Sequence, residues 1–345
     1  MTGMKNVMVL AVMIIWLFPI KLCFSVESDL IWDLQAVDAN GVATHPKVAI
    51  PGVYWVPNTP ENLLVFEGIS LASKGELDNP DGPGFQWLSI WVQSEADKGG
   101  IQVFSGVWMK NMFWSSYPEV QAGDRVRITG WAAFYNGKTF INDRHDETGS
   151  TMWSVEIISH GEMPEPEVIP SIFDCNYFDQ TRTGGGERWQ TRWVKLENVE
   201  IDSGTWANGE QITISDGTGL LIMKLADFGD FNAYNAPTGK FDVTGLFDQE
   251  DSAAPYHDNY RIWVKKYADL TPPIPELIIR AGTSPDTIEI EWDSSAGTIY
   301  KIMESENMSS WTQVGDDIEG DDTTKIIPVA YTGNIKFYRL EARLE

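Results

Sequence analysis

The chain has 345 residues, and its 50 Asp and Glu against 25 Lys and Arg give a formal net charge of −25. This excess of acid excludes a protein that binds polyanions through bulk positive charge, because neutralising phosphates requires a surplus of Lys and Arg. The length excludes one small domain, since domains usually contain about 100–200 residues. Hydrophobic residues make up 43% of the chain and include 15 Trp, so the chain can bury a folded core.

The first 25 residues have the pattern of a secretory signal peptide. Lys5 is followed by the apolar run Val7–Phe18, and the small residues Cys23 and Ser25 precede a predicted cleavage site after Ser25. The run is shorter than the ~20 apolar residues of a membrane-spanning helix, and no later segment is apolar for long enough to span a membrane. The sequence therefore predicts a secreted protein (periplasmic, extracellular or on the cell surface), with an uncleaved anchor as the alternative.

Cysteine usage limits the covalent chemistry of the chain. After the predicted cleavage only Cys175 remains, so no internal disulfide can form. The four histidines are scattered, and none lies beside this cysteine in the sequence. We therefore expect Cys175 to be a buried structural residue rather than a nucleophile.

Short alternating apolar segments, broken by Gly, Pro, Asn and Asp, recur along the chain and are typical of an all-β protein. Two proline-rich segments, residues 163–170 and 270–275, have the composition of linkers between domains. The predicted division is a signal peptide (1–25), an N-terminal extension (26–58), two similar units (59–165 and 166–272) and a C-terminal unit (273–345).

The two middle units share a short pattern. Residues 123–130 and 239–245 both run from a turn glycine through alternating apolar positions to a Thr-Gly pair, and the two pairs lie 115 residues apart. A glycine at the end of such a strand suits the bend by which a small barrel closes. The pattern resembles the fourth strand of an OB-fold.

The flanking segments extend this resemblance to two OB-like modules of bacterial secreted proteins, some of which accompany nucleases. The strands predicted for the first unit are 64–70, 85–93, 101–104, 125–134 and 153–158, with a short capping helix over 107–117. Those predicted for the second unit are 194–201, 211–216, 220–225, 241–247 and 260–264. The resemblance implies that each unit is a five-stranded barrel.

The C-terminal unit begins with strand-like segments, among them 287–292, where Ile288, Ile290 and Trp292 alternate on one face. Further short strands are predicted over 298–304, 311–314, 325–329 and 336–340. The unit resembles a fibronectin type III-like module of bacterial surface proteins. The predicted fold class is therefore all-β, with two OB-like five-stranded barrels followed by a small β-sandwich.

The second predicted strand of the first unit carries an aromatic face. Strand periodicity places Phe85, Trp87 and Trp91 on one side and Leu88, Ile90 and Val92 on the other. OB-folds bind oligonucleotides or oligosaccharides on the outside of this strand, where flat rings can stack on bases or sugars. We predict the three aromatic residues as ligand contacts. The alternative is that the N-terminal extension or the neighbouring domain covers them.

A second candidate site is the run 182–195, which interleaves basic and aromatic residues. Its candidate ligand contacts are Arg182, Arg188, Trp189, Arg192 and Trp193, because guanidinium groups grip anions and stack on rings. The glycines of this run lack the Gly-Lys-Ser/Thr ending of a phosphate-binding loop. The alternative is a loop leading to a strand with structural Arg–Trp stacking.

Two acidic clusters, 248–251 and 316–322, are predicted as solvated turns that keep the protein soluble. Weak calcium binding is the alternative, although neither cluster has the ligand spacing of an EF-hand loop. His145 lies among carboxylates within 143–147, but the sequence contains no nucleophile motif and no metal-ligand spacing. We therefore predict no catalytic residues, no metal site and no cofactor.

These features lead to three hypotheses. The first is a secreted, non-enzymatic protein that binds an extended oligonucleotide or oligosaccharide by aromatic stacking. The charge favours the sugar, whereas the OB-like modules favour the nucleic acid. The second is a structural protein of the cell surface that has protein partners and buries its rings between domains. The third is a secreted hydrolase.

Overall fold

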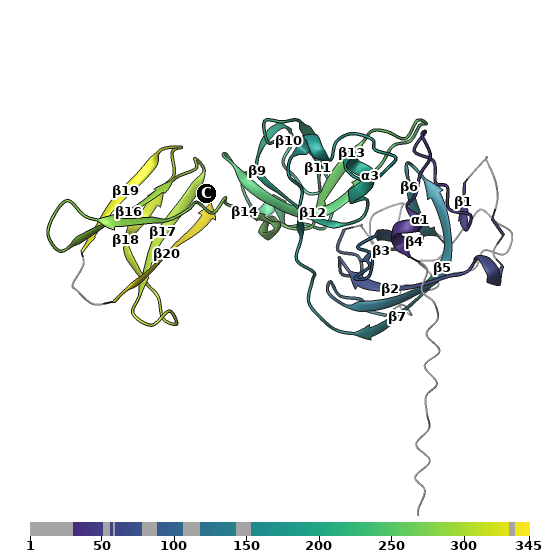
Figure 1. The fold of residues 1–345 in the computed structure, drawn as a ribbon, viewed down its shortest axis with the longest axis horizontal. Coiled ribbons are helices and arrows are strands. Elements are labelled where there is room, and N and C mark those ends of the chain that lie inside the picture. Colours follow the sequence, from purple (N-terminus) through teal and green to yellow (C-terminus); the bar gives the residue numbers. More distant parts are fainter. Residues whose placement is uncertain are drawn as a thin grey trace, which may run out of the picture.

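The computed structural model describes residues 30–50, 56–57, 59–77, 88–105, 118–142, 153–330 and 335–345. These residues form an all-β molecule with two closed five-stranded barrels and a small sandwich, as predicted (Figure 1). The described α-helices are short: α1 (Ile31–Leu34) and α3 (Gly185–Trp189). Within the described ranges, no helix has the length and apolar character needed to cross a membrane.

Several predictions fall outside the described residues. They concern the signal peptide (1–25), the aromatic residues Phe85 and Trp87, the capping helix (107–117) and the acidic segment around His145 (143–147). The domain boundaries also stay predictions. The strands of the first sheet lie between residues 48 and 159, and those of the second lie between residues 167 and 271.

Barrel 1 consists of β2 (Leu64–Ser70), β3 (Leu88–Gln93), β4 (Gly100–Ser105), β5 (Arg125–Tyr135) and β6 (Lys138–Asn142). Neighbouring strands pair in the order β5-β2-β3-β4-β6, and a β5–β6 pairing closes the barrel. β4 and β6 run parallel, whereas the other neighbours are antiparallel. The inward side chains of alternate positions fill the barrel, as the period of two in a strand requires.

The predicted fifth strand of barrel 1, residues 153–158, is wrong. The closing strand is β6, and β7 (Ser154–Ser159) pairs with the first half of β5 outside the five-stranded ring. The reason is the turn Asn136–Gly137, in which both residues have positive φ (51° and 87°). This dipeptide favours a tight two-residue hairpin, which brings β6 onto β5 before the chain reaches residue 153.

Barrel 2 consists of β9 (Trp193–Gly204), β10 (Gln211–Ser215), β11 (Leu220–Leu225), β12 (Phe241–Gln249) and β13 (Tyr260–Val264). Its five predicted strand positions are confirmed. The strand order is that of barrel 1, with β11 and β13 parallel and a β12–β9 pairing that closes the ring. Short peripheral strands complete the two sheets: β1 (Val48–Ala49), β8 (Glu167–Val168) and β14 (Leu270–Thr271).

Cys175 lies in the core of barrel 2, as predicted, together with aliphatic side chains such as Ile169 and Ile172. Burial, with a smaller contribution from Asp216 and Asp174, raises the pKa of its thiol to about 12. A thiol with so high a pKa forms little thiolate near neutral pH, which agrees with a structural role.

The C-terminal sandwich has two three-stranded sheets. One contains β15 (Ile278–Ala281), β16 (Thr287–Asp293) and β19 (Thr324–Ala330), and the other contains β18 (Thr312–Glu319), β17 (Thr298–Ser305) and β20 (Phe337–Leu344). Ile290, Trp292, Tyr300 and Ile302 form its core. The resemblance to a fibronectin type III module stays a prediction.

Candidate ligand-binding surface

In an OB-fold the ligand lies on the outer face of the second and third strands, between the loops that follow the first and fourth strands. In barrel 1 these strands are β3 and β4. Their outward polar side chains, Ser89, Gln93 and Gln102, are all buried in this structure. Barrel 2 contacts this face at Trp91, Gln93 and Gly100.

An apolar layer joins the two barrels. Trp91 on β3 packs edge-on against Trp263 on β13, with ring centroids 5.5 Å apart and an interplanar angle of 75°. The members of this layer are Leu71, Ala72, Leu77 and Trp91 from barrel 1, and Trp193, Ala226, Leu246 and Trp263 from barrel 2. The layer is separate from the cores inside the barrels, so it holds the barrels together rather than closing either one.

Beside this layer the backbones of the barrels approach closely. The Trp193 N–H donates to the Gln93 side-chain oxygen at 2.8 Å. At Gly100 on β4, a Cβ atom would lie 1.9 Å from the carbonyl oxygen of Thr191. Only glycine leaves room for this approach, and the face of β4 is therefore shaped to receive barrel 2.

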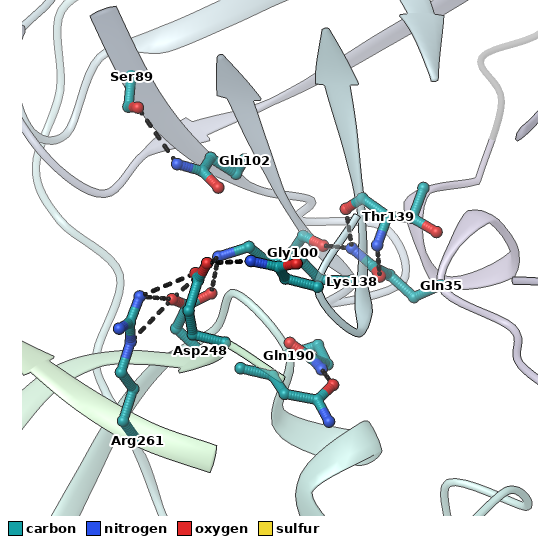
Figure 2. Close-up of polar contacts among 12 residues, drawn as sticks. Gln35, Ser89, Gly100, Gln102, Lys138, Thr139, Gln190, Asp248 and Arg261 are labelled. Carbon is teal, nitrogen blue, oxygen red and sulfur yellow. Dashed lines mark hydrogen bonds and ion pairs between the residues drawn. The ribbon is translucent and has the colours of Figure 1, made fainter. Parts of the chain in front are cut away.

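Buried charges bridge the barrels next to β6. The Lys138 ammonium lies 2.8 Å from Asp248 Oδ1, and the Arg261 guanidinium lies 2.7 Å from Asp248 Oδ2 (Figure 2). Glu250 Oε2 is 3.2 Å from both cations. Burial alone would raise the pKa of Asp248, but Lys138 and Arg261 lower it by more, so the carboxylate stays ionised.

The prediction that residues 248–251 form a solvated turn is therefore wrong. Asp248 and Gln249 end β12 and are completely buried, and Asp251 is buried as well. The other acidic cluster, 316–322, lies partly in β18 and is mostly exposed. Among the described residues, no three His, Cys, Asp or Glu side chains form a group that could hold a metal ion.

The hairpin turn of barrel 1 also contacts barrel 2. The Asp251 N–H donates to the Asn136 carbonyl at 3.0 Å, and the Asn136 amide donates to Glu250 Oε1 at 2.6 Å. From the N-terminal segment, the Gln35 amide donates to the carbonyls of Gly100 and Thr139, as Figure 2 shows. The face of barrel 1 that would hold a ligand is thus occupied by the protein itself.

Trp91 and Trp193, two of the candidate ligand contacts, are not accessible to a ligand in this structure. Trp91 is 1% exposed and Trp193 is 6% exposed, because each ring lies in the layer between the barrels. The alternative stated above, in which the neighbouring domain covers these rings, describes them correctly. Strand periodicity identified the outward face of β3 but could not show what lies against it.

The basic and aromatic run of barrel 2 is structural in this conformation. Trp189 belongs to the core of barrel 2, and the guanidinium groups of Arg188 and Arg192 lie 5.0 and 5.2 Å from its ring centroid. Arg192 is buried and ion-paired with Glu167. The Arg182 guanidinium lies over the Trp32 ring, 4.2 Å from the ring centroid, and donates a hydrogen bond to the backbone carbonyl of Trp32. Trp189 and Arg192 are therefore not accessible to a ligand here, and the alternative of structural Arg–Trp stacking describes them.

The corresponding face of barrel 2 is not covered. We call it the open face, and it comprises the outward residues of β10 and β11, which are Gln211, Thr213, Ser215, Leu220, Ile222 and Lys224. All six are exposed or half-buried, whereas the residues between them fill the barrel core. Barrel 2 contacts barrel 1 through β9, β12 and β13 instead, so a ligand could still reach β10 and β11.

Aromatic side chains that the sequence analysis did not single out gather at one end of the open face. We call Trp206, Phe231, Tyr234 and Tyr267 the aromatic cluster. Trp206 lies in the β9–β10 loop, and its indole N–H donates to the carbonyls of Phe231 and Tyr234 at 3.0 and 3.1 Å. Tyr234 stacks on Tyr267 with ring centroids 4.3 Å apart and remains 48% exposed. The β9–β10 loop corresponds to a ligand-binding loop of OB-folds.

At the other end of the open face, beside the β10–β11 turn, lie two more exposed rings. Phe173 and Tyr177 have ring centroids 6.1 Å apart, and both are exposed. The Phe173 N–H donates to the Thr218 hydroxyl of that turn at 3.1 Å, and the Asn176 amide donates to the Leu220 carbonyl at 2.7 Å. Exposed rings therefore flank β10 and β11 at both ends.

The surroundings of the open face are acidic. Lys224, its one cation, bonds the Gly209 carbonyl and pairs with Asp227 at 3.4 Å. Residues 166–272 contain nine Lys and Arg against seventeen Asp and Glu. Glu200 pairs with Ser215 across the strands, Glu210 and Asp216 flank β10, and Asp227 lies beside Lys224. Such a surface repels phosphates and leaves an uncharged ligand unaffected.

A buried carboxyl group of barrel 2 lies in α3. Glu187 is 2% exposed, and its Oε1 accepts a hydrogen bond of 2.8 Å from the Tyr260 hydroxyl. Desolvation raises the pKa of Glu187 from 4.5 to about 7, although Tyr260, Gln190 and Arg182 partly offset this effect. A side chain so enclosed cannot touch a polymeric substrate, so we assign it a structural rather than a catalytic role.

The raised pKa of Glu187 predicts a pH dependence of stability. Between about pH 4.5 and 7 the unfolded chain releases this proton while the folded protein keeps it. The contribution of Glu187 to the free energy of unfolding is therefore fully present below pH 4.5. It is lost as the pH rises towards 7, which lowers the free energy of unfolding by about 3 kcal/mol. Urea unfolding across this range should show the decline in the wild type but not in Glu187→Gln. Equal pH slopes for the two proteins would contradict the assignment.

No protein-family model matches the chain, and no curated protein matches it. It is similar to a chain described as "Crystal structure of Ifi202 HINa domain in complex with 20bp dsDNA" (11% identity, 80% of this chain, 95% of that chain, TM-score 0.26). It is also similar to a chain described as "Structure and Conformational Change of a Replication Protein A Heterotrimer Bound to ssDNA". The identity is 10% over 60% of this chain and 50% of that chain, and the TM-score is 0.24.

A third similar chain is described as "Structural mimicry for functional antagonism", with 10% identity over 58% of this chain and 87% of that chain, and a TM-score of 0.25. TM-scores this low support no conclusion about the function of this protein. The functional argument therefore rests on the open face, the aromatic cluster and the charge around them.

Proposed function

We propose that the protein is a secreted, non-enzymatic binding protein that holds an extended polymer along the open face of barrel 2. The observation that carries the proposal is the asymmetry between the barrels. The ligand face of barrel 1 is buried under barrel 2, whereas the same face of barrel 2 is accessible and has exposed rings at both ends. The export of the protein rests on the sequence pattern of residues 1–25.

The charge favours an uncharged oligosaccharide as the polymer. Lys224 is already bonded, and acidic side chains surround the open face, so few cations remain there to hold phosphates. The apolar faces of sugar rings can stack on exposed aromatic side chains such as Tyr234, as bases do in other OB-folds. Polar side chains on β10, including Thr213 and Ser215, can bond hydroxyl groups.

The experiment is a glycan array combined with titration of fluorescent oligonucleotides at several salt concentrations. We expect a neutral glycan to bind with little dependence on salt. Tyr234→Ala should weaken this binding by roughly tenfold, because one stacked ring contributes ~1–3 kcal/mol. The matched control is Tyr135→Ala, which removes a 59% exposed tyrosine from barrel 1 and should leave binding unchanged.

Other results would change the assignment. Tight oligonucleotide binding that weakens steeply with salt would identify a nucleic acid as the ligand. Absence of any polymer binding would leave the second hypothesis, a structural protein of the cell surface, which the burial of Trp91 and Trp193 between the barrels specifically favours. Hydrolysis of a bound glycan would identify the protein as an enzyme.

A further inference from the structure

The C-terminal sandwich has a free edge at β20, whose last residue, Leu344, packs against barrel 2. β20 pairs with β17 along its whole length, and no described strand pairs with its other side. The Glu345 N–H donates to the Gly297 carbonyl at 2.9 Å, which identifies these opposite residues as a hydrogen-bonded pair. Bonded and non-bonded pairs alternate in an antiparallel ladder. The backbone N–H and C=O groups that bond β17 are therefore those of Arg339, Glu341 and Arg343. The backbone groups of Leu340 and Ala342 point to the free edge.

The sandwich is also incompletely covered near its edges. Leu340 and Ala342 face the core, but they are only half-buried, whereas Ile302 and Tyr300 opposite them on β17 are fully buried. On the edge strand of the other sheet, Ile279 pairs with the buried Ile290 and so faces the core side, yet it is 48% exposed. An added strand beside β20 would cover apolar surface as well as supply backbone partners.

The sequence of β20 is complementary to itself. In an antiparallel pairing of two copies centred on Leu340, Arg339 of each copy lies opposite Glu341 of the other, and Phe337 lies opposite Arg343. The paired backbone groups in this register are those of Leu340 and Ala342, which are the ones that point to the free edge. A register centred on Glu341 would use the same free backbone groups, but it would place Glu341 opposite Glu341 and Arg339 opposite Arg343, so like charges would meet.

We propose that β20 is a docking edge for a second copy of this chain, which joins the two sandwiches into one continuous six-stranded sheet. The pairing is isologous, with a two-fold axis at Leu340, so it closes at a dimer. Each dimer presents two copies of barrel 2, and any ligand long enough to reach both would be bound with increased avidity.

The test is sedimentation of the full chain over a range of concentrations. We expect the wild type to dimerise. Arg339→Glu and Glu341→Arg should each raise the dimer dissociation constant by at least about tenfold, because each places two pairs of like charges across the axis. The double variant Arg339→Glu/Glu341→Arg restores opposite charges and should restore the dimer. Arg280→Glu, on the exposed side of β15, is the control and should not change the association.

A further variant separates loss of the dimer from loss of the fold. Ala342→Pro removes an N–H that β17 does not use, so the sandwich should still fold while the dimer is lost. Circular dichroism confirms folding in each case. A wild type that is monomeric at all concentrations overturns the proposal. So does a dimer that survives both charge reversals and Ala342→Pro, or a folded double variant that fails to recover the dimer.

Discussion

Asp248→Asn is expected to lower the free energy of unfolding by about 3–5 kcal/mol, because it removes the buried carboxylate that Lys138 and Arg261 share and leaves only the half-buried Glu250 opposite them. Lys138 and Asp248 are both buried, and they belong to different barrels. Arg261, which comes from barrel 2, bonds the same carboxylate. Loss of this charge should therefore weaken the contact between the barrels as well as barrel 2 itself.

Urea unfolding followed by fluorescence checks this expectation. Glu156→Gln is the control, since Glu156 pairs with Arg127 on the exposed side of barrel 1 and should contribute less than about 1 kcal/mol. In the wild type the two barrels should unfold in one transition. In Asp248→Asn they should unfold in two separate transitions. An Asp248→Asn protein as stable as the control would show that the bridge is not formed.

The second large effect is expected from Trp91→Ala, which should cost about 3–5 kcal/mol. The Trp91 side chain points out of barrel 1 and contributes to the layer between the barrels, not to the core of barrel 1. Its removal opens a cavity against Trp263 and Trp193. The destabilisation should therefore appear as weaker coupling of the barrels, with barrel 1 still folded.

Differential scanning calorimetry separates these contributions. Trp311→Ala is the matched control, because Trp311 is a half-buried tryptophan of the sandwich and should cost clearly less. We expect one dominant transition in the wild type and two resolved barrel transitions in Trp91→Ala. If Trp91→Ala behaves like Trp311→Ala, the layer between the barrels contributes little to stability.

The sequence predicted the elements of the fold well because alternation and turn residues are local signals. All five strands of barrel 2 and the buried Cys175 follow from such patterns. The closing strand of barrel 1 was missed although its signal, Asn136–Gly137, is also local. The segment 153–158 does form a strand, but alternation alone does not show which strand it pairs with.

The candidate site could not be predicted in the same way, because it depends on contacts between distant residues. Lys138 and Asp248 lie 110 residues apart, and an acidic run in the sequence resembles a solvated loop whether or not a buried cation meets it. The period of two placed Trp91 on the outside of barrel 1 correctly, yet the docking of barrel 2 buries that outside face. Trp206 and Tyr234 approach each other only because the loops that carry them meet at one end of barrel 2.

Hydroxyl-radical footprinting with residue-level mass spectrometry tests the central claim most directly, namely that barrel 2 covers the ligand face of barrel 1 and leaves its own face open. The account predicts slow oxidation of Trp91 and Trp263, relative to the unfolded chain, and fast oxidation of Tyr234 and Phe173. Oxidation of Trp91 as fast as that of Tyr234 would mean that the ligand face of barrel 1 is open in solution, and would contradict the account.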